Sequence, residues 1–224
     1  MYKRVKKKLC FFILLTLPVV LNAQKDVTQF LGIPVDGNKS EMIQKLKDKG
    51  FTISPNKKDV LAGEFNGTDV NIHIITNNNK VRRIAVVDAN PTSEEYIKIR
   101  FNNLLKQFQN NRYLFNSDSI VEKYTISKDE DISYELLVHK KLYQAVFYQK
   151  TLDYDSLNLK IKAFKEPNDS ISKQQLIAMM SNQVNELYKC LNKKVWFSLG
   201  KLSGEYKITM YYDNVYNEAN GDSL

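Results

Sequence analysis

Short turn signals separate most of the β-strand patterns in this chain, and they constrain its fold more than any other feature. Asn66-Gly67 joins the alternating apolar runs 61–65 and 70–76, and Ser203-Gly204 joins another pair of strand patterns near the C-terminus. Asn-Gly is the strongest short-range signal for a β-hairpin. Strands joined this closely pair antiparallel, because a parallel neighbour needs a crossover connection of about a dozen residues or more. The chain is therefore expected to build a largely antiparallel sheet.

Three segments carry the 3.6-residue periodicity of amphipathic helices: 39–49, 91–110 and 172–191. Asn38 is expected to cap the first helix and Asn90 the second, with Pro91 at its first position. The third is expected to bury an apolar stripe of Leu176, Met180, Val184, Leu187 and Leu191. Strands are expected after each helix: 61–65, 70–76 and 81–88; 120–126, 132–138, 142–149 and 157–164; 195–199 and 205–212. Three helices on such a sheet give an α+β fold, in which helix-then-strands units either repeat or merely alternate.

The first 23 residues have the layout of a secretory signal peptide. Five basic residues precede an apolar run from 9 to 21, and Ala23 supplies the small residue before the expected cleavage point. The apolar run is too short for a membrane-spanning helix. We therefore expect a mature protein of residues 24–224 in the periplasm or outside the cell, with no transmembrane segment once the signal is removed.

The charge of the mature chain is close to balanced. The whole chain has 33 basic and 25 acidic residues, and the leader holds five of the basic residues and none of the acidic ones. The mature part then carries 28 basic against 25 acidic residues, which gives no reason to expect a nucleic-acid partner. Its length suits one α+β domain or two similar subdomains, 24–90 and 91–224.

The sequence offers no catalytic, metal or cofactor signature. His73 and His139 are the only histidines, and neither has a second ligand at metal-like spacing. Cys190 is the one cysteine left after processing, and its apolar setting predicts a packed thiol. The acidic run 129–131 lacks the other ligand positions of a calcium loop. We therefore assign no catalytic residue, metal ligand or cofactor.

Aromatic residues are concentrated in the last two strand patterns. Because they alternate along the strands, some of the rings must face away from the core. An exposed ring offers a large contact area at little cost in entropy, which suits a protein or glycan ligand. The candidate ligand-binding residues are Trp196, Tyr206, Tyr211 and Tyr212. The alternative is that the second face of the sheet is simply half apolar.

Four serines follow an aspartate and precede an aliphatic residue: Ser119, Ser156, Ser170 and Ser223. This pattern resembles the O-glycosylation sequon of exported proteins from Bacteroides-type bacteria, which makes the four serines candidate glycosylation sites. Asp-Ser also forms turns and helix caps without any modification.

The N-terminal half shows a wider resemblance. The segment 30–37 (FLGIPVDG), the helix end at 45–51 and the strand motif 63–67 (GEFNG) resemble exported proteins of unknown function from Bacteroides-type bacteria. The resemblance covers about residues 24–110 and implies a compartment and a lineage, not an activity. At the level of fold alone, the helix-then-sheet units are similar to the repeats of secreted β-lactamase inhibitor proteins, and fold does not fix function.

Two classes of function follow. The first is a non-enzymatic extracytoplasmic binding or protein-interaction module, favoured by the absence of catalytic motifs and by the strand aromatics. The alternative is a secreted or periplasmic hydrolase acting on glycan or peptide. A cleft with two facing carboxylates or a His–acid pair would favour the enzyme, whereas a broad aromatic sheet face without such a pair would favour the module.

Overall fold

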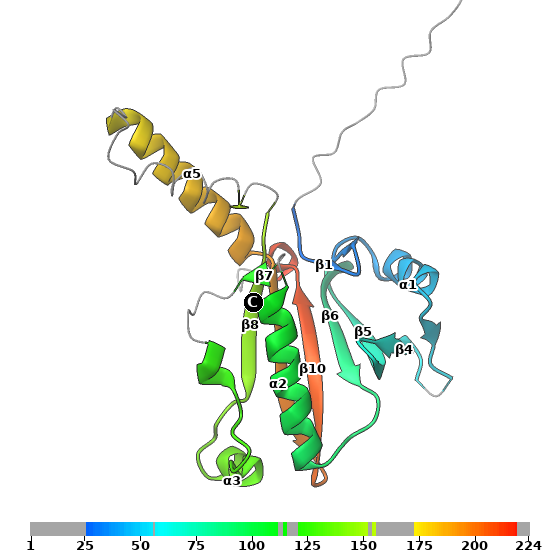
Figure 1. The fold of residues 1–224 in the computed structure, drawn as a ribbon. Helices are drawn as coiled ribbons and strands as arrows, with labels where there is room; N and C mark the ends of the chain where they lie inside the picture. Colours follow the sequence, from blue (N-terminus) through cyan, green and yellow to red (C-terminus); the bar gives the residue numbers. More distant parts are fainter. Residues whose placement is uncertain are drawn as a thin grey trace, which may run out of the picture.

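The computed structural model describes residues 26–55, 57–111, 114–115, 121–151, 154–155 and 173–218 (Figure 1). The expected signal peptide and the predicted strand 157–164 lie outside these ranges. So do the four candidate glycosylation sites, Ser119, Ser156, Ser170 and Ser223.

An eight-stranded antiparallel sheet forms the body, in the order β3-β4-β5-β6-β10-β9-β8-β7. Its strands are β3 (Thr52–Ile53), β4 (Val60–Phe65), β5 (Thr68–Asn77), β6 (Lys80–Asp88), β7 (Leu114–Phe115), β8 (Gln144–Gln149), β9 (Lys194–Leu202) and β10 (Glu205–Asp213). A separate two-stranded hairpin consists of β1 (Gln29–Phe30) and β2 (Ile33–Pro34). The expected α+β fold with a largely antiparallel sheet is thus confirmed.

Four α-helices lie in the described ranges: α1 (Lys39–Asp48), α2 (Glu94–Asn110), α3 (Ile132–Leu137) and α5 (Lys173–Leu191). The described ranges also contain two 3₁₀ helices, η1 (Val121–Tyr124) and η2 (Val215–Asn217). The side chain of Asn38 caps α1 by accepting from the backbone N–H of Glu41, as the sequence predicts. Within the described ranges, no helix combines the length and apolar content needed to cross a membrane.

Helix α2 begins three residues later than expected. Ser93, not Asn90, occupies its N-cap. The backbone of Thr92 exchanges two hydrogen bonds of 2.9 Å with Tyr206 on β10, which keeps the preceding segment extended. A long-range bridge therefore overrides the local helix signal of Asn90-Pro91.

The core lies between one face of the sheet and helices α1 and α2. Met42 and Leu46 of α1 belong to the same buried cluster as the α2 residues Ile97, Phe101, Leu104 and Leu105. Alternate residues of β5, β6, β10, β9 and β8 supply the sheet side of the cluster. Both helices therefore cover the same face, and Figure 1 shows α2 lying along the strands of the sheet.

The predicted strands 120–126 and 132–138 are wrong. Residues 121–124 form η1, and 132–137 form α3. Asp131 caps α3 by accepting from the N–H of Tyr134, and the N–H of Ile132 donates to Glu94 of α2 at 2.8 Å. These bonds satisfy the free N–H groups of a helix start, which favours a helix over the strand suggested by the alternation. Segments 69–75 and 131–137 share an alternation of apolar and polar residues, yet the first belongs to β5, whereas residues 132–137 of the second form α3.

The expected buried stripe of the third helix is also wrong. Met180, Val184 and Leu187 have exposed fractions of 58%, 50% and 41%. Figure 1 shows α5 projecting away from the sheet, with only its C-terminal end close to β8. At that end Cys190 is fully buried, which confirms the prediction of a packed thiol. The periodicity predicted the helix correctly but not its surroundings.

Candidate functional site

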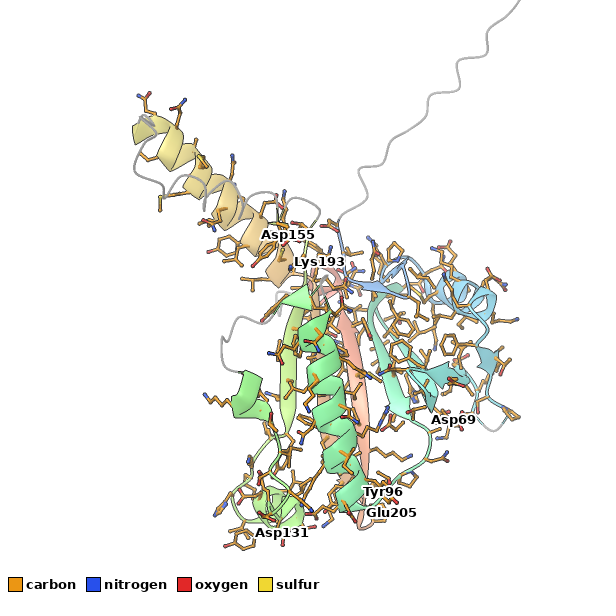
Figure 2. The ribbon with its side chains drawn as sticks, in the orientation of Figure 1. Asp69, Tyr96, Asp131, Asp155, Lys193 and Glu205 are labelled. Atoms are coloured by element: carbon orange, nitrogen blue, oxygen red, sulfur yellow. The ribbon has the colours of Figure 1, made fainter. Side chains whose placement is uncertain are left out.

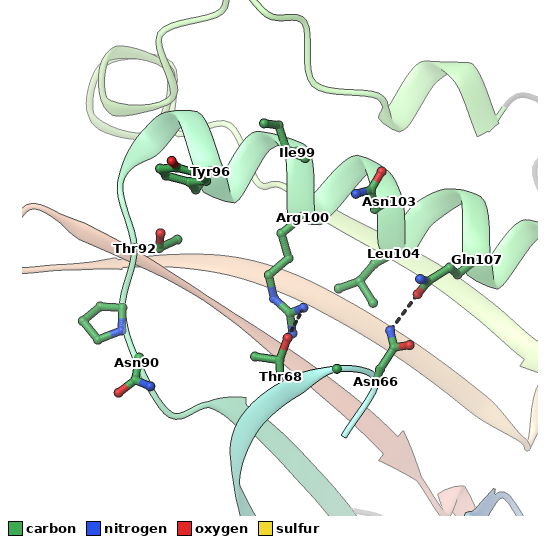
Figure 3. Close-up of a pocket in the computed structure, with 12 residues that line it drawn as sticks. Asn66, Thr68, Asn90, Thr92, Tyr96, Ile99, Arg100, Asn103, Leu104 and Gln107 are labelled. Carbon is green, nitrogen blue, oxygen red and sulfur yellow. Dashed lines mark hydrogen bonds between the residues drawn. The ribbon is translucent and has the colours of Figure 1, made fainter. Parts of the chain in front are cut away.

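Two cavities border α2 on the side of the sheet that carries the core. The small pocket has a volume of about 500 Å³ and lies between α2 and the β4–β5 turn (Figure 3). The large groove has a volume of about 1040 Å³ and reaches from the β1–β2 hairpin to β8. Asn66 and Gln107 line both cavities and share a hydrogen bond of 2.6 Å. This bonded pair therefore marks the boundary between the two cavities.

The large groove combines an apolar surface with polar edges. Its apolar residues come from seven elements or turns: Leu31, Phe51, Phe65, Phe108, Leu114, Val195 and Tyr212. Leu31 stands in the β1–β2 turn with a φ of 52° and an exposed fraction of 40%. A left-handed backbone is uncommon for a residue of this kind, and here it places an exposed apolar side chain at the rim of the groove.

Tyr212 lines the groove and is 8% exposed. Its ring packs against Phe30 with 4.7 Å between the ring centroids. Within the described part of the chain its hydroxyl has no hydrogen-bond partner, and burial raises the pKa of Tyr212. Buried polar groups nearly always have a partner, so an unsatisfied one calls for an explanation. A ligand in the groove that accepts from this hydroxyl would supply one.

Charges of both signs stand at the edges of the groove. Lys150 pairs with Asp155 at 3.0 Å, and Lys193 pairs with Asp26 at 2.7 Å. Figure 2 shows Asp155 and Lys193 near the base of α5. The groove is also lined by Lys49 and Glu64, which are exposed and form no ion pair with any residue in the described ranges.

The opposite face of the sheet brings together two of the four predicted aromatic residues. Trp196 and Tyr211 are directly opposite each other on β9 and β10, and their rings stack at 4.1 Å with an interplanar angle of 22°. They belong to one row of residues in register across six strands: Val60, His73, Ala85, Tyr211, Trp196 and Val146. We refer to this row as the open-face row.

An arginine is fixed against this aromatic pair. The Arg83 guanidinium lies 5.5 Å from the ring centroid of Trp196 and 5.0 Å from that of Tyr211. It also forms two hydrogen bonds to Asp213, of 2.5 and 2.9 Å, and the same carboxylate accepts from Trp196 Nε1 at 2.8 Å. The polar groups of the cluster thus satisfy one another within the protein.

Tyr206, the fourth predicted aromatic residue, is buried on the core face like Tyr212. Its hydroxyl donates to Glu94 Oε2 at 2.7 Å and shares a 2.5 Å hydrogen bond with Ser133. Burial raises the pKa of Glu94, but the hydrogen bonds from Tyr206, from the Ile132 N–H and from Lys98 outweigh it and lower that pKa to about 2. The network ties α3 to α2 and β10.

Ser133 also accepts from Lys201 Nζ at 2.6 Å, an arrangement that resembles a nucleophile beside a base. Neither residue lines the small pocket or the large groove. His139 contacts Glu135 at 2.9 Å on an exposed part of α3, again outside both cavities. Among the described residues there is no group of three or more His, Cys, Asp or Glu side chains that could hold a metal ion. None of these side chains therefore lines the small pocket or the large groove.

The sequence did not single out the large groove as a site. Its side chains are spread from the N-terminal hairpin to β10, and each alone resembles an ordinary core or surface residue. A weak signal exists for the small pocket, because Tyr96, Asn103 and Gln107 recur along one flank of α2 at helical spacing.

Comparisons with known proteins found no relative of this chain. No protein-family model matches the chain, and searches of curated proteins and of solved structures likewise found no match. The resemblance over residues 24–110 and the export of the chain therefore stay predictions, and the function must be argued from the cavities themselves.

Proposed function

We propose that this chain is a non-enzymatic extracytoplasmic binding module whose large groove holds a short extended segment of a partner protein. The observation that carries the proposal is Tyr212, which lines a groove of about 1040 Å³ and whose buried hydroxyl has no partner in the described part of the chain. Apolar pockets with a few placed polar groups are the usual form of a binding site.

The mixed lining favours a polypeptide over a purely apolar ligand. An apolar side chain of the partner would lie against Phe65 and Phe108, and a backbone carbonyl would accept from the Tyr212 hydroxyl. The unpaired Lys49 and Glu64 would pair with charges of opposite sign on the partner. An acyl chain would leave these two charges without a partner.

The hydrolase alternative has less support. The nearest arrangement to a catalytic pair, Ser133 with Lys201, lies outside both cavities. Of the three acidic residues lining the large groove, Asp26 and Asp155 are held by lysines. The groove therefore offers recognition groups more readily than an acid–base pair.

The proposal is tested by selecting short random peptides on the mature protein from a displayed library, then measuring their affinity by calorimetry. Tyr212→Phe removes the hydroxyl alone, and we expect it to weaken the selected peptides about threefold to tenfold, the range of one hydrogen bond. Lys49→Glu should change affinity in the direction set by the charge of the peptide. Lys47→Glu makes the same charge change on an exposed residue of α1 outside the groove and should have little effect.

Selection of no peptide, or peptides that bind all three variants like the parent protein, would overturn the groove as the site. Peptides weakened by Trp196→Ala but not by Tyr212→Phe would place the binding surface on the open-face row instead.

A further inference from the structure

Seven of the twelve residues that line the small pocket have uncharged polar side chains; the others are Gly67, Pro91, Ile99, Leu104 and Arg100. Four primary amides surround it (Asn66, Asn90, Asn103 and Gln107), together with the hydroxyls of Thr68, Thr92 and Tyr96 (Figure 3). A primary amide both donates and accepts hydrogen bonds. The side chains of Asn90 and Asn103 are exposed and form no hydrogen bond within the described ranges. The pocket therefore presents free donors and acceptors at two positions, Asn90 before α2 and Asn103 on α2.

The single charged residue in the lining is neutralised. Arg100 binds both carboxylate oxygens of Asp88, at 2.9 and 2.6 Å, and donates to Thr68 Oγ1 at 2.8 Å. Asp88 is 3% exposed and also accepts from the Ile208 N–H at 3.1 Å. This bidentate pair with a buried carboxylate neutralises the charge of Arg100, so the pocket has no excess positive charge to attract an anionic ligand.

An aromatic ring stands at the open edge of the pocket. Tyr96 is 67% exposed at the N-terminal end of α2, and Figure 2 shows it near Glu205 of the β9–β10 hairpin. Ile99, one turn further along the helix, is 54% exposed. A ring held on a helix offers an apolar face together with a hydroxyl that reaches solvent.

The frame of the pocket is fixed at three points. Thr92 is held to β10 by its paired backbone bonds with Tyr206, and Asn66 is held to α2 by Gln107. The Arg100–Asp88 pair fixes the middle of the helix to the end of β6. Because the walls are already ordered, a ligand would lose little affinity to ordering them.

We propose that the small pocket binds a neutral saccharide, with Asn90 and Asn103 bonded to its hydroxyls and Tyr96 against one face of a sugar ring. A saccharide carries many groups that both donate and accept, as the amides do, and it has the weakly apolar C–H faces that an aromatic ring contacts. A volume of about 500 Å³ lies within the range of small-molecule pockets and suits one or two sugar rings. This site shares only the bonded pair Asn66 and Gln107 with the large groove, and the proposal does not rest on what the large groove binds.

The test measures binding of neutral oligosaccharides (maltotriose, cellobiose and diacetylchitobiose) to the mature protein by calorimetry and saturation-transfer NMR. Glucuronate and glucosamine serve as charged comparators. We expect at least one neutral saccharide to bind in the millimolar range or tighter, and more tightly than either charged sugar. Tyr96→Ala should weaken it at least tenfold, and Asn103→Ala about threefold to tenfold.

Matched controls delete side chains of the same two types at positions outside the small pocket. Asn110→Ala deletes another exposed amide of α2, and Tyr188→Ala deletes an equally exposed tyrosine on α5; both should keep the parent affinity. The four residues are exposed, so all variants should keep the parent melting temperature. The proposal is overturned if none of the three neutral saccharides binds, if a charged sugar binds more tightly, or if the controls weaken binding as much as the pocket variants.

Discussion

Tyr206 and Tyr212 provide a sharp test of how buried hydroxyls affect this fold. Both are on the core face of β10 and are at least nine-tenths buried. The Tyr206 hydroxyl is bonded to Glu94 and Ser133, whereas that of Tyr212 has no partner in the described part of the chain. Replacing each tyrosine by phenylalanine removes one oxygen and keeps the ring. We therefore expect the two variants to shift stability in opposite directions.

The contacts set the magnitudes. Tyr206→Phe removes a hydrogen bond to an ionised carboxylate, which contributes about 1.5–3 kcal/mol, so we expect a loss of about 2 kcal/mol. Tyr212→Phe removes an unsatisfied hydroxyl whose burial costs about 1–3 kcal/mol, so we expect a gain of about 1 kcal/mol. In a chain of this length, each 1 kcal/mol moves the melting temperature by roughly 2–4 °C.

Urea unfolding followed by fluorescence measures both variants, since Trp196 is the only tryptophan of the chain. The pH dependence separates them further. The pKa of Glu94 is about 2 in the folded protein against 4.5 ordinarily, so its contribution is complete above pH 4.5 and is lost as the pH falls towards 2. The difference in the free energy of unfolding between the parent protein and Tyr206→Phe should become smaller as the pH falls over this range. The difference between the parent protein and Tyr212→Phe should stay the same.

Two results would contradict this reasoning. A clear loss of stability in Tyr212→Phe would mean that its hydroxyl has a partner in the folded protein, and the argument for a ligand at that point would fail. A Tyr206→Phe variant as stable as the parent at pH 7 would mean that the network around Glu94 contributes nothing net.

Three further predictions concern the core, one histidine and the thiol. Leu104→Ala should lower the free energy of unfolding, measured in urea melts, by about 2–5 kcal/mol, because Leu104 is 1% exposed in the main buried cluster. A loss under about 0.5 kcal/mol would mean that Leu104 lies outside the core. Burial and the nearby Lys57 lower the pKa of His73 below 6.5, so the unfolded chain takes up the proton first and the parent should lose stability as the pH falls below 6.5. His73→Gln should remove that part of the pH dependence, and superimposable profiles of the two proteins would refute it. Cys190 is fully buried and burial raises its pKa, so a thiol reagent should label it only at the rate of unfolding; rapid labelling of the folded protein would contradict this.

The parts of the fold that depend on local chemistry could be predicted from the sequence. Asn66-Gly67 and Ser203-Gly204 both adopt the left-handed turns expected of hairpins, and Asn38 caps α1. The failures have long-range causes. The segment 132–137 alternates like a strand, but its first N–H is bonded to Glu94, 38 residues earlier. A pattern of side chains cannot show a partner that far away.

The same limit applies to α5. Its apolar positions recur at helical spacing, and this correctly predicted a helix over residues 173–191. The helical spacing predicts which side chains share a face of the helix, but it does not predict what packs against that face. Here Val184 is half exposed while Cys190, less than two turns later, is fully buried. Burial thus changes along the length of the helix without any change in the pattern.

The aromatic residues of β10 show most clearly which features a sequence predicts and which depend on long-range contacts. The alternation along β10 places Tyr206 and Tyr212 on one face and Tyr211 on the other, and a sequence can supply that much. Whether a buried hydroxyl is satisfied depends on residues such as Glu94, 112 positions from Tyr206 in the chain. A buried hydroxyl without a hydrogen-bond partner is costly, and a fold without a use for it would be more stable with phenylalanine there. Tyrosine at 212 is therefore better explained by the binding that we propose for the large groove than by the packing of the core.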